Sequence, residues 1–285
     1  MTDTRARVLV FDSGVGGLSI VRALWQQLVG IEVVYLADNA CFPYGELSER
    51  TVNDRCIEIV ARALADYSCE LAVIACNTAS TIVLPELRAV VAVPVVGVVP
   101  AIKPAAAVSQ NRRIGLLATP ATVSRPYIEQ LVSVHASDCS IVRVGSSELV
   151  MLAENSLEEG EVPLHRVQPI LAPFVNGGVD TIILGCTHFP LIRQSLMAAM
   201  PQGLHWADSG EAIARRVGQL LPGRSAKQAR GSARMAAFLH SGPEPTGVAA
   251  WLRRESVVSG NANPVQIRRV SLNTARNSIS GSADW

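Results

Sequence analysis

Short apolar runs alternate with amphipathic stretches along most of the chain. The runs are rich in Val, Ile and Leu, which is typical of strands buried on both faces, and the stretches between them show helical spacing. This alternation predicts βαβ units and mainly parallel sheets covered by helices, an α/β fold. The expected strands are 7–12, 32–37, 71–75, 94–99, 113–118, 140–145, 181–185 and 204–207. The expected helices are about 17–28, 48–67, 78–91, 101–109, 121–134, 147–155, 164–176, 189–200 and 209–220.

A faint internal repeat runs through this pattern. The segment "RVLVFDSGVGG" begins at Arg7 and "RIGLLATPATV" begins at Arg113, an offset of 106 (113 − 7). Two apolar runs end on Cys76 and on Cys186, an offset of 110 (186 − 76). Two halves of similar size predict two similar domains, pseudo-twofold related and facing each other. The alternative is that any two βα units look alike.

Composition narrows the class of protein. The 285 residues are 49% apolar but 5% aromatic, which suits parallel sheets between helices. A net charge of +1 gives no strong field for nucleic acid. The longest apolar run, residues 89–102, is shorter than the roughly 20 residues of a membrane span, and no signal-peptide region precedes the first strand. Six cysteines without a CxxC pair predict reduced thiols in the cytoplasm.

The amino-acid composition changes after residue 220. From residue 222 onward nine Arg and Lys accompany three Asp and Glu, a balance of +6, whereas the rest of the chain carries −5 (16 − 21). The segment 258–285 is polar and is expected to be a flexible basic tail. Such a tail can meet an anionic partner, although a solvated tail is the simpler interpretation.

The two cysteines at strand ends are the first candidates for chemistry. Ligands of open α/β sheets bind beyond the carboxyl ends of the strands, where Cys76 and Cys186 both lie. A following helix is expected to lower a thiol's pKa from ~8.5 toward neutrality. One buried cysteine is usually a small hydrophobic residue, but two in the same structural position favour a shared role. Inverting a carbon stereocentre needs an acid and a base on opposite faces, and two thiols meet that need.

The stretch "FDSGVGGLSI" closes the first strand. Asp12 and Ser13 stand at its carboxyl end, and the glycines after them let backbone approach a ligand such as a carboxylate. The rival interpretation is a dinucleotide-binding GxGxxG motif. It matches at Gly14 and Gly16, but the third glycine position is Ser19. A plain tight turn is the third interpretation.

Three further features have a functional and a structural interpretation. The turn 43–45 carries the hydroxyl of Tyr44 toward a ligand or toward solvent. His188 lies two residues after Cys186, and because two ligands do not make a zinc site, we interpret it as a residue that tunes the thiol or contacts the substrate. The repeated Asp-Ser-Gly at 208–210 is interpreted as a helix cap.

Together these motifs resemble the cofactor-independent aspartate/glutamate racemase family. The resemblance rests on "FDSGVGG" (11–17), "PYGE" (43–46), "CNTAS" (76–80) and "GCTHFPL" (185–191), in that order. It covers roughly residues 7–220, and "CTHFP" after the second cysteine favours the glutamate members.

The resemblance implies a fold and an activity. It implies a discontinuous first α/β domain, residues 1–101 plus 212–257, an inserted second domain, residues 102–211, and an active site between them. It implies interconversion of L- and D-glutamate, with no pyridoxal phosphate and no metal, to supply peptidoglycan synthesis. A related racemase for aspartate or another amino acid is the close alternative. From other classes, a dinucleotide-dependent oxidoreductase and a non-catalytic binding protein stay open.

Residue roles carried over by position follow from the same resemblance. Cys76 is expected to take the proton from D-glutamate and Cys186 from L-glutamate. Asp12 occupies the family's acidic position near the first thiol, His188 its histidine position near the second, and Glu154 another acidic position. The expected substrate contacts are Asp12, Ser13, Tyr44, Gly45, Asn77, Thr78, Thr119, Thr122, Thr187 and His188.

Two departures and three partner expectations complete the comparison with the family. The segment "SSELVMLAEN" around Glu154 lacks the Cys-Pro of some members, and the tail past ~257 has no counterpart. The family forms homodimers, and some members are activated by a cell-wall precursor or bind DNA gyrase. The residues of this chain decide none of the three.

Overall fold

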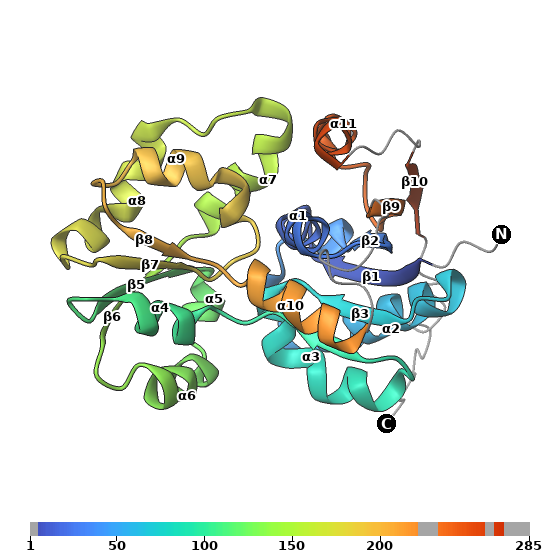
Figure 1. Ribbon diagram of the computed structural model, residues 1–285, viewed down its shortest axis with the longest axis horizontal. Coiled ribbons are helices and arrows are strands. Elements are labelled where there is room, and N and C mark those ends of the chain that lie inside the picture. Colours follow the sequence, from blue (N-terminus) through green and yellow to red (C-terminus); the bar gives the residue numbers. More distant parts are fainter. Residues whose placement is uncertain (1–4, 222–232, 260–264, 271–285) are drawn as a thin grey trace, which may run out of the picture.

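The computed structural model describes residues 5–221, 233–259 and 265–270. It consists of two lobes, each built on a parallel sheet with helices on both faces (Figure 1). The strands are β1 Ala6–Asp12, β2 Ile31–Ala37, β3 Leu71–Ile74, β4 Val95–Gly97, β5 Arg113–Ala118, β6 Ser140–Gly145, β7 Thr181–Leu184, β8 His205–Ala207, β9 Arg234–His240 and β10 Gln266–Arg269. The α-helices are α1 Leu18–Gln27, α2 Glu49–Tyr67, α3 Asn77–Val90, α4 Ile102–Val108, α5 Pro120–Val123, α6 Pro126–His135, α7 Ser147–Glu159, α8 Leu164–Asn176, α9 Arg193–Ala198, α10 Gly210–Leu220 and α11 Val248–Ser259. Three 3₁₀ turns are η1 Asn39–Cys41, η2 Tyr44–Glu46 and η3 Phe189–Ile192.

The first lobe holds a six-stranded sheet of order β10-β9-β2-β1-β3-β4. Successive residues of β1 point to opposite faces, so Val8 and Val10 join one core and Leu9 and Phe11 the other. Helices α1, α10 and α11 cover the first face, and α2 and α3 cover the second. Because both faces are covered, strands β1, β2 and β3 show no alternation of buried and exposed residues.

The second lobe holds a four-stranded sheet of order β6-β5-β7-β8. Helices α7 and α8 pack on one face, and α4 and α6 pack on the other. This order matches β2-β1-β3-β4 of the first lobe, strand for strand. The predicted fold class, two α/β domains with parallel sheets, is therefore confirmed, and the cysteines of the sequence repeat follow the equivalent strands β3 and β7.

The chain passes from the first lobe to the second after β4 and returns at α10. The two crossing segments touch, because the Ser209 hydroxyl donates a hydrogen bond to the Val99 carbonyl. Asp208 accepts the backbone N–H of Gly210, the first residue of α10, at 2.9 Å, whereas the side chain of the N-cap residue Ser209 makes no capping hydrogen bond. The capping interpretation of this Asp-Ser-Gly thus describes Asp208, while Ser209 joins the two connections.

The structure corrects two sequence-based expectations. Residues 266–269, expected within the flexible tail 258–285, form β10, which pairs in parallel with β9. A strand forms there because β9 offers an edge and the partly buried Ile267 packs on the core. The other residues of that tail beyond α11, except 265 and 270, lie outside the described ranges. The single helix expected over 121–134 is two, since Arg125 takes an extended conformation before Pro126.

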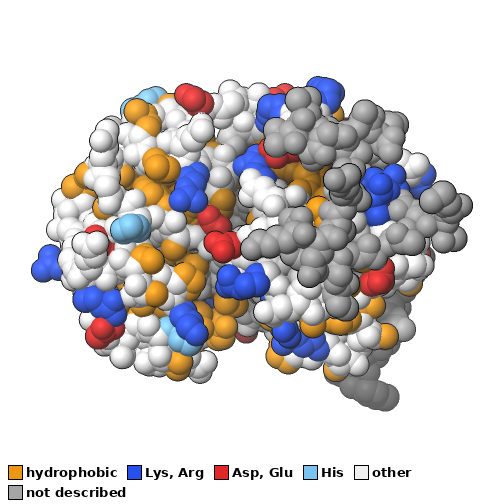
Figure 2. All heavy atoms as spheres, viewed as in Figure 1, with side chains coloured by type: hydrophobic (Ala, Val, Ile, Leu, Met, Phe, Trp, Pro, Cys, Tyr) orange, Lys and Arg blue, Asp and Glu red, His pale blue; other side chains and the backbone are white. Residues whose placement is uncertain are grey.

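The surface shows no gathering of one charge on the face in view. Lys and Arg side chains are interspersed with Asp and Glu across both lobes (Figure 2). Among the described helices, none has the length and apolar character needed to cross a membrane.

Candidate functional site

The carboxyl ends of the central strands of the two lobes meet at one small cavity. Its volume is about 20 Å³, room for roughly one water. Cys76 and Cys186 both line it and are 6% and 7% exposed. The residues lining it are Ser13, Phe42, Pro43, Tyr44, Gly45, Cys76, Asn77, Thr78, Thr119, Val150, Cys186, Thr187 and His188. Ten of the predicted site residues are in this set, while Asp12, Glu154 and Thr122 lie behind it and contact its members.

Cys76 lies between β3 and the first turn of α3. Its sulfur is 3.8 Å from the Ser13 hydroxyl, which in turn donates to Asp12 Oδ1 at 3.4 Å. Asp12 is fully buried at the end of β1. Burial raises the pKa of Asp12, although the nearby charge of His188 acts in the opposite direction. The first thiol is thus linked to a carboxyl group through one hydroxyl.

The expectation of a lowered thiol pKa is wrong for Cys76. Burial and the negative charge of Asp12 raise the pKa of Cys76 to about 12. The backbone N–H of Ala79 at the start of α3 does favour the thiolate, as expected of a helix N-terminus. Desolvation outweighs it, because a fully buried anion loses the stabilisation of water.

Cys186 has a different neighbour. Its sulfur is 3.6 Å from His188 Nδ1, and His188 Nε2 is 2.7 Å from Glu154 Oε2 on α7. Burial opposes a charged His188, but hydrogen bonds to Cys186 and Glu154 and the charges of both raise its pKa well above its ordinary value. The second thiol is thus linked to a carboxyl group through an imidazole.

Hydrogen bonds cross between the lobes at the glycine-rich turn. Thr187 donates to Asp12 Oδ2 at 2.8 Å, and the Val15 N–H donates to Glu154 Oε2 at 3.0 Å. A Cβ at Gly14 would lie 2.6 Å from Glu154 Oε2, and one at Gly16 would overlap the ring of His188. The glycines therefore allow this turn to approach the acid–base groups of the other lobe.

The polar residues around the cavity fall into two groups. Asn77 Oδ1 is buried and accepts no hydrogen bond from the described residues. Thr78 lies 3.5 Å from both Thr119 and Thr122, whose hydroxyls are 2.9 Å apart. An unpartnered amide oxygen beside a hydroxyl cluster is suited to a small ligand with donor and acceptor groups.

The turn after β2 carries Tyr44 and Gly45 to the cavity wall. The hydroxyl of Tyr44 donates to Asp38 at 2.5 Å, so its ring faces the site while its oxygen is engaged behind it. Gly45 packs beside Thr119 of the second lobe.

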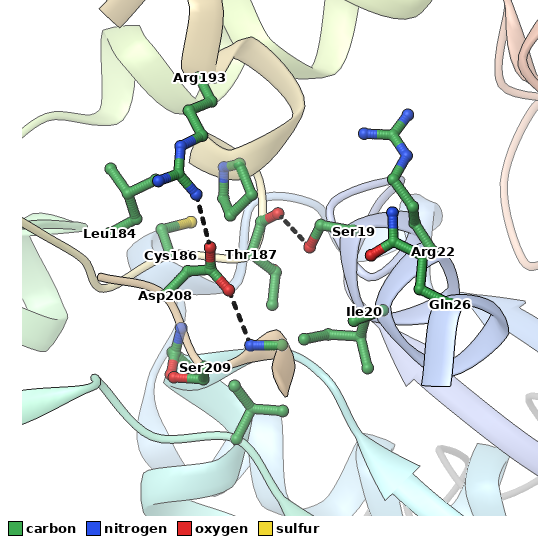
Figure 3. Close-up of a pocket in the computed structure, with 15 residues that line it drawn as sticks. Ser19, Ile20, Arg22, Gln26, Leu184, Cys186, Thr187, Arg193, Asp208 and Ser209 are labelled. Atoms are coloured by element: carbon green, nitrogen blue, oxygen red, sulfur yellow. Dashed lines mark hydrogen bonds and ion pairs between the residues drawn. The ribbon is translucent and has the colours of Figure 1, made fainter. Parts of the chain in front are cut away.

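A second cavity of about 230 Å³ lies behind Cys186. Figure 3 shows Arg193 and Asp208 on one side of it and Arg22 and Gln26 on the other, with Cys186 in its wall. Three residues line both cavities and form the wall between them, namely Asn77, Cys186 and Thr187.

Sequence reasoning missed several residues at the site. Phe42 and Val150 line the cavity, and Asp38, Arg55 and Ser241 hold Tyr44 from behind. The position of Asp38 directly after an apolar strand was a usable signal, because strand ends meet at the site. In the described part of the chain, no group of three His, Cys, Asp or Glu side chains could hold a metal ion.

Comparisons with known proteins point to one family. The Asp/Glu/Hydantoin racemase family model matches residues 18–217. A glutamate racemase of Shewanella loihica is 52% identical over 216 residues, 76% of this chain and 81% of the relative. The crystal structure of Escherichia coli glutamate racemase in complex with L-glutamate and the activator UDP-MurNAc-Ala is similar with a TM-score of 0.81 and 40% identity, over 94% of this chain and 98% of that one. The Francisella tularensis enzyme in complex with D-glutamate has a TM-score of 0.71 and 25% identity, over 95% and 99%.

Proposed function

The chain belongs to the Asp/Glu/Hydantoin racemase family and is an isomerase, and we propose that it interconverts L- and D-glutamate by moving the Cα proton between two thiols. The observation that carries the proposal is the placement of Cys76 and Cys186 on one cavity, each after the equivalent strand of its lobe. Acid–base groups from two facing lobes can address opposite faces of a carbon held between them.

The reaction uses two proton transfers and no other reactant. From L-glutamate, the thiolate of Cys186 takes the Cα proton, and the electron pair of the C–H bond stays on the substrate as a carbanion stabilised by the adjacent carboxylate. The thiol of Cys76 then gives its proton to the opposite face. Cys186 ends as thiol and Cys76 as thiolate, and the reverse reaction exchanges the roles.

Each thiol has a group that can reset its proton. Asp12 reaches Cys76 through Ser13, and Glu154 reaches Cys186 through His188. A pKa of about 12 keeps Cys76 protonated at neutral pH. The resting enzyme therefore holds the proton that the conversion of L-glutamate delivers.

The wall of the cavity offers partners for the charged groups of an amino acid. The unpartnered Oδ1 of Asn77 is an acceptor for the substrate ammonium group. The first turn of α3, which begins at Asn77, favours a carboxylate through the partial positive charge of a helix N-terminus. We assign Thr78, buried in the wall, to the same carboxylate, while the hydroxyl of Thr187 already donates to Asp12.

The described conformation is closed. A cavity of about 20 Å³ holds roughly one water, and glutamate is many times larger. The lobes therefore separate to admit the substrate and close again over it. Closure removes water from the carbanion, which would otherwise be protonated without control of its stereochemistry.

The test is racemisation without any added cofactor. Purified protein incubated with L-glutamate should lose the circular dichroism of that enantiomer and reach a racemic mixture. Cys76→Ala and Cys186→Ala should each reduce the rate by about 10⁴-fold or more, since each removes a group that transfers the proton. Racemisation of L-aspartate with no action on glutamate would instead support the related specificity.

The structure from Escherichia coli suggests the setting of the reaction, since it contains the activator UDP-MurNAc-Ala. We propose that this chain supplies D-glutamate to peptidoglycan synthesis in the cytoplasm and that a precursor of this kind raises its activity. Turnover measured with and without UDP-MurNAc-Ala tests the regulation, and an unchanged rate contradicts it. A homodimer and a contact with DNA gyrase stay predictions from the family resemblance.

A further inference from the structure

A buried carboxylate lies directly behind the substrate cavity. Asp38 follows β2, is fully buried, and accepts four hydrogen bonds. Arg55 donates two of them, at 2.5 and 2.6 Å, and the hydroxyls of Tyr44 and Ser241 donate one each at 2.5 Å. A carboxylate has about four acceptor positions, so Asp38 has none left for a substrate. Asp38 therefore holds neighbouring segments in place, and we call Asp38, Arg55, Tyr44 and Ser241 together the anchor.

The segment after β9 completes this anchor. The Ser241 hydroxyl oxygen also accepts the backbone N–H of Ala40 at 3.0 Å. The Gly242 N–H donates to Asn39 Oδ1 at 2.8 Å, and Asn39 Nδ2 donates to the Pro243 carbonyl at 2.6 Å. Residues 241–243 therefore hold η1, although they lie about 200 residues away in the sequence.

The anchor connects to the substrate cavity at two points. Tyr44, whose hydroxyl donates to Asp38, lies in the cavity wall with Pro43 and Gly45. The Asp38 N–H donates to the Asp12 carbonyl at 2.9 Å. The turn 43–45 supplies shape and backbone groups to the wall, while the thiols come from elements after β3 and β7. Displacing this turn should weaken binding and leave proton transfer intact.

We propose that Asp38, Arg55 and Ser241 are positioning residues that set the affinity for the substrate by fixing the turn 43–45 through the hydroxyl of Tyr44. The strand β9 thereby contributes to the active site without contacting the substrate. The inference rests on the proposed racemase function only for its kinetic readout.

Strand β2, which Asp38 follows, also offers a matched control. Glu32 lies at the amino end of β2, is also buried, and is also held by arginines. Arg7 Nε donates to it at 2.8 Å and Arg234 Nε at 2.7 Å. This carboxylate has the same chemistry as Asp38 but lies at the opposite end of the sheet from the cavity. If Asp38 acted on stability alone, substitutions of Asp38 and of Glu32 would have the same effect, a lower Tm with an unchanged KM.

The kinetic experiment compares Asp38→Asn with Glu32→Gln. For Asp38→Asn we expect KM for glutamate to rise about tenfold with kcat within about twofold, as for loss of hydrogen bonds to one buried charge. For Glu32→Gln we expect a lower Tm with KM within about twofold of the parent. Ser241→Ala should raise KM about threefold, and Ser241→Thr, which keeps the hydroxyl, should restore it.

Hydrogen–deuterium exchange supplies a readout independent of catalysis. Amides of residues 39–47 should exchange faster in Asp38→Asn and in Tyr44→Phe but not in Glu32→Gln. If the parent fails to racemise glutamate while this exchange pattern holds, the proposed function is wrong and the anchor stands. Unchanged KM and unchanged local exchange in Ser241→Ala and Tyr44→Phe would overturn the proposal, even if Asp38→Asn did not fold.

Discussion

Cys76 and Cys186 occupy the same position in two lobes that share the order of four strands, yet their surroundings differ. Cys76 is followed by the 14-residue helix α3 and contacts a hydroxyl, with Asp12 behind it. Cys186 is followed by the short turn η3 and contacts an imidazole, with Glu154 behind it. The fold has repeated the position of the sulfur but not its acid–base partner.

This difference has a consequence for the proton balance of the site. Burial and the charge of Asp12 raise the pKa of Cys76 to about 12, whereas, against the effect of burial, hydrogen bonds to Cys186 and Glu154 raise the pKa of His188 well above its ordinary value. Two identical environments would make both thiols bases or both acids at once. An unequal pair allows one side to hold a proton while the other accepts one.

The largest effect that separates the two sides is expected for His188→Asn. Removing the imidazole should lower kcat/KM by about 10²- to 10⁴-fold, because Cys186 loses its proton partner. The two enantiomers have equal free energy, so kcat/KM must fall equally in both directions. The isotope effect on kcat/KM shows which of the two proton transfers has been slowed. It should increase with 2-deuterated L-glutamate and decrease with 2-deuterated D-glutamate.

The control for that comparison is Ser13→Ala on the other side. It should show the opposite pattern, with the larger isotope effect on the D enantiomer, since Cys76 then becomes the slow side. Equal isotope effects in both variants would contradict separate proton relays for the two thiols.

A smaller effect is expected for Gly16→Ala. Its Cβ would lie 2.7 Å from Thr187 Oγ1 and would overlap the ring of His188, so the lobes could not close fully. We expect kcat to fall about tenfold through misplacement of the thiols. Gly218→Ala is the matched control, because its Cβ meets the movable end of Leu28 far from the cavity. A normal rate in Gly16→Ala would show that close contact of the lobes is not required.

The smallest effect is expected on stability, for Asp12→Asn. Burial raises the pKa of Asp12 above 3.8, so the folded state binds a proton more tightly than the unfolded state. The stability that this proton gives is full below the unfolded pKa and is lost as pH rises through the folded pKa. Asp12→Asn should therefore have a higher Tm than the parent at neutral pH, and the difference should shrink in acid. A Tm below the parent's at neutral pH would contradict this sign.

Much of the fold was predictable because strands β1, β2, β3 and β7 are buried on both faces and form clear apolar runs in the sequence. Strands β9 and β10 were not predicted. The sequence of β9, "RMAAFLH", contains two Ala and no Val or Ile, and its strand character comes from pairing with β2. The segment of β10 has exposed Gln and Arg and depends in turn on β9.

The site was predictable where chemistry follows a strand end and not where distant segments meet. Cys76 and Cys186 were identified because each stops an apolar run. The raised pKa of Cys76 depends on burial and on Asp12, which lies 64 positions away (76 − 12) and becomes a neighbour only in the fold. The hydroxyl of Tyr44 was expected near a ligand, but it donates a hydrogen bond to Asp38, which lies behind the cavity wall.

The measurement that tests the two-thiol account most directly is exchange of the Cα proton in D₂O by single-cysteine variants, followed by proton NMR and circular dichroism. Without its partner, each thiol should still remove a proton from one enantiomer and return deuterium to the same face. Cys76→Ala should deuterate L-glutamate alone, Cys186→Ala should deuterate D-glutamate alone, and neither should racemise. Deuteration of both enantiomers by one variant, or racemisation by either, would contradict a mechanism with one thiol on each face.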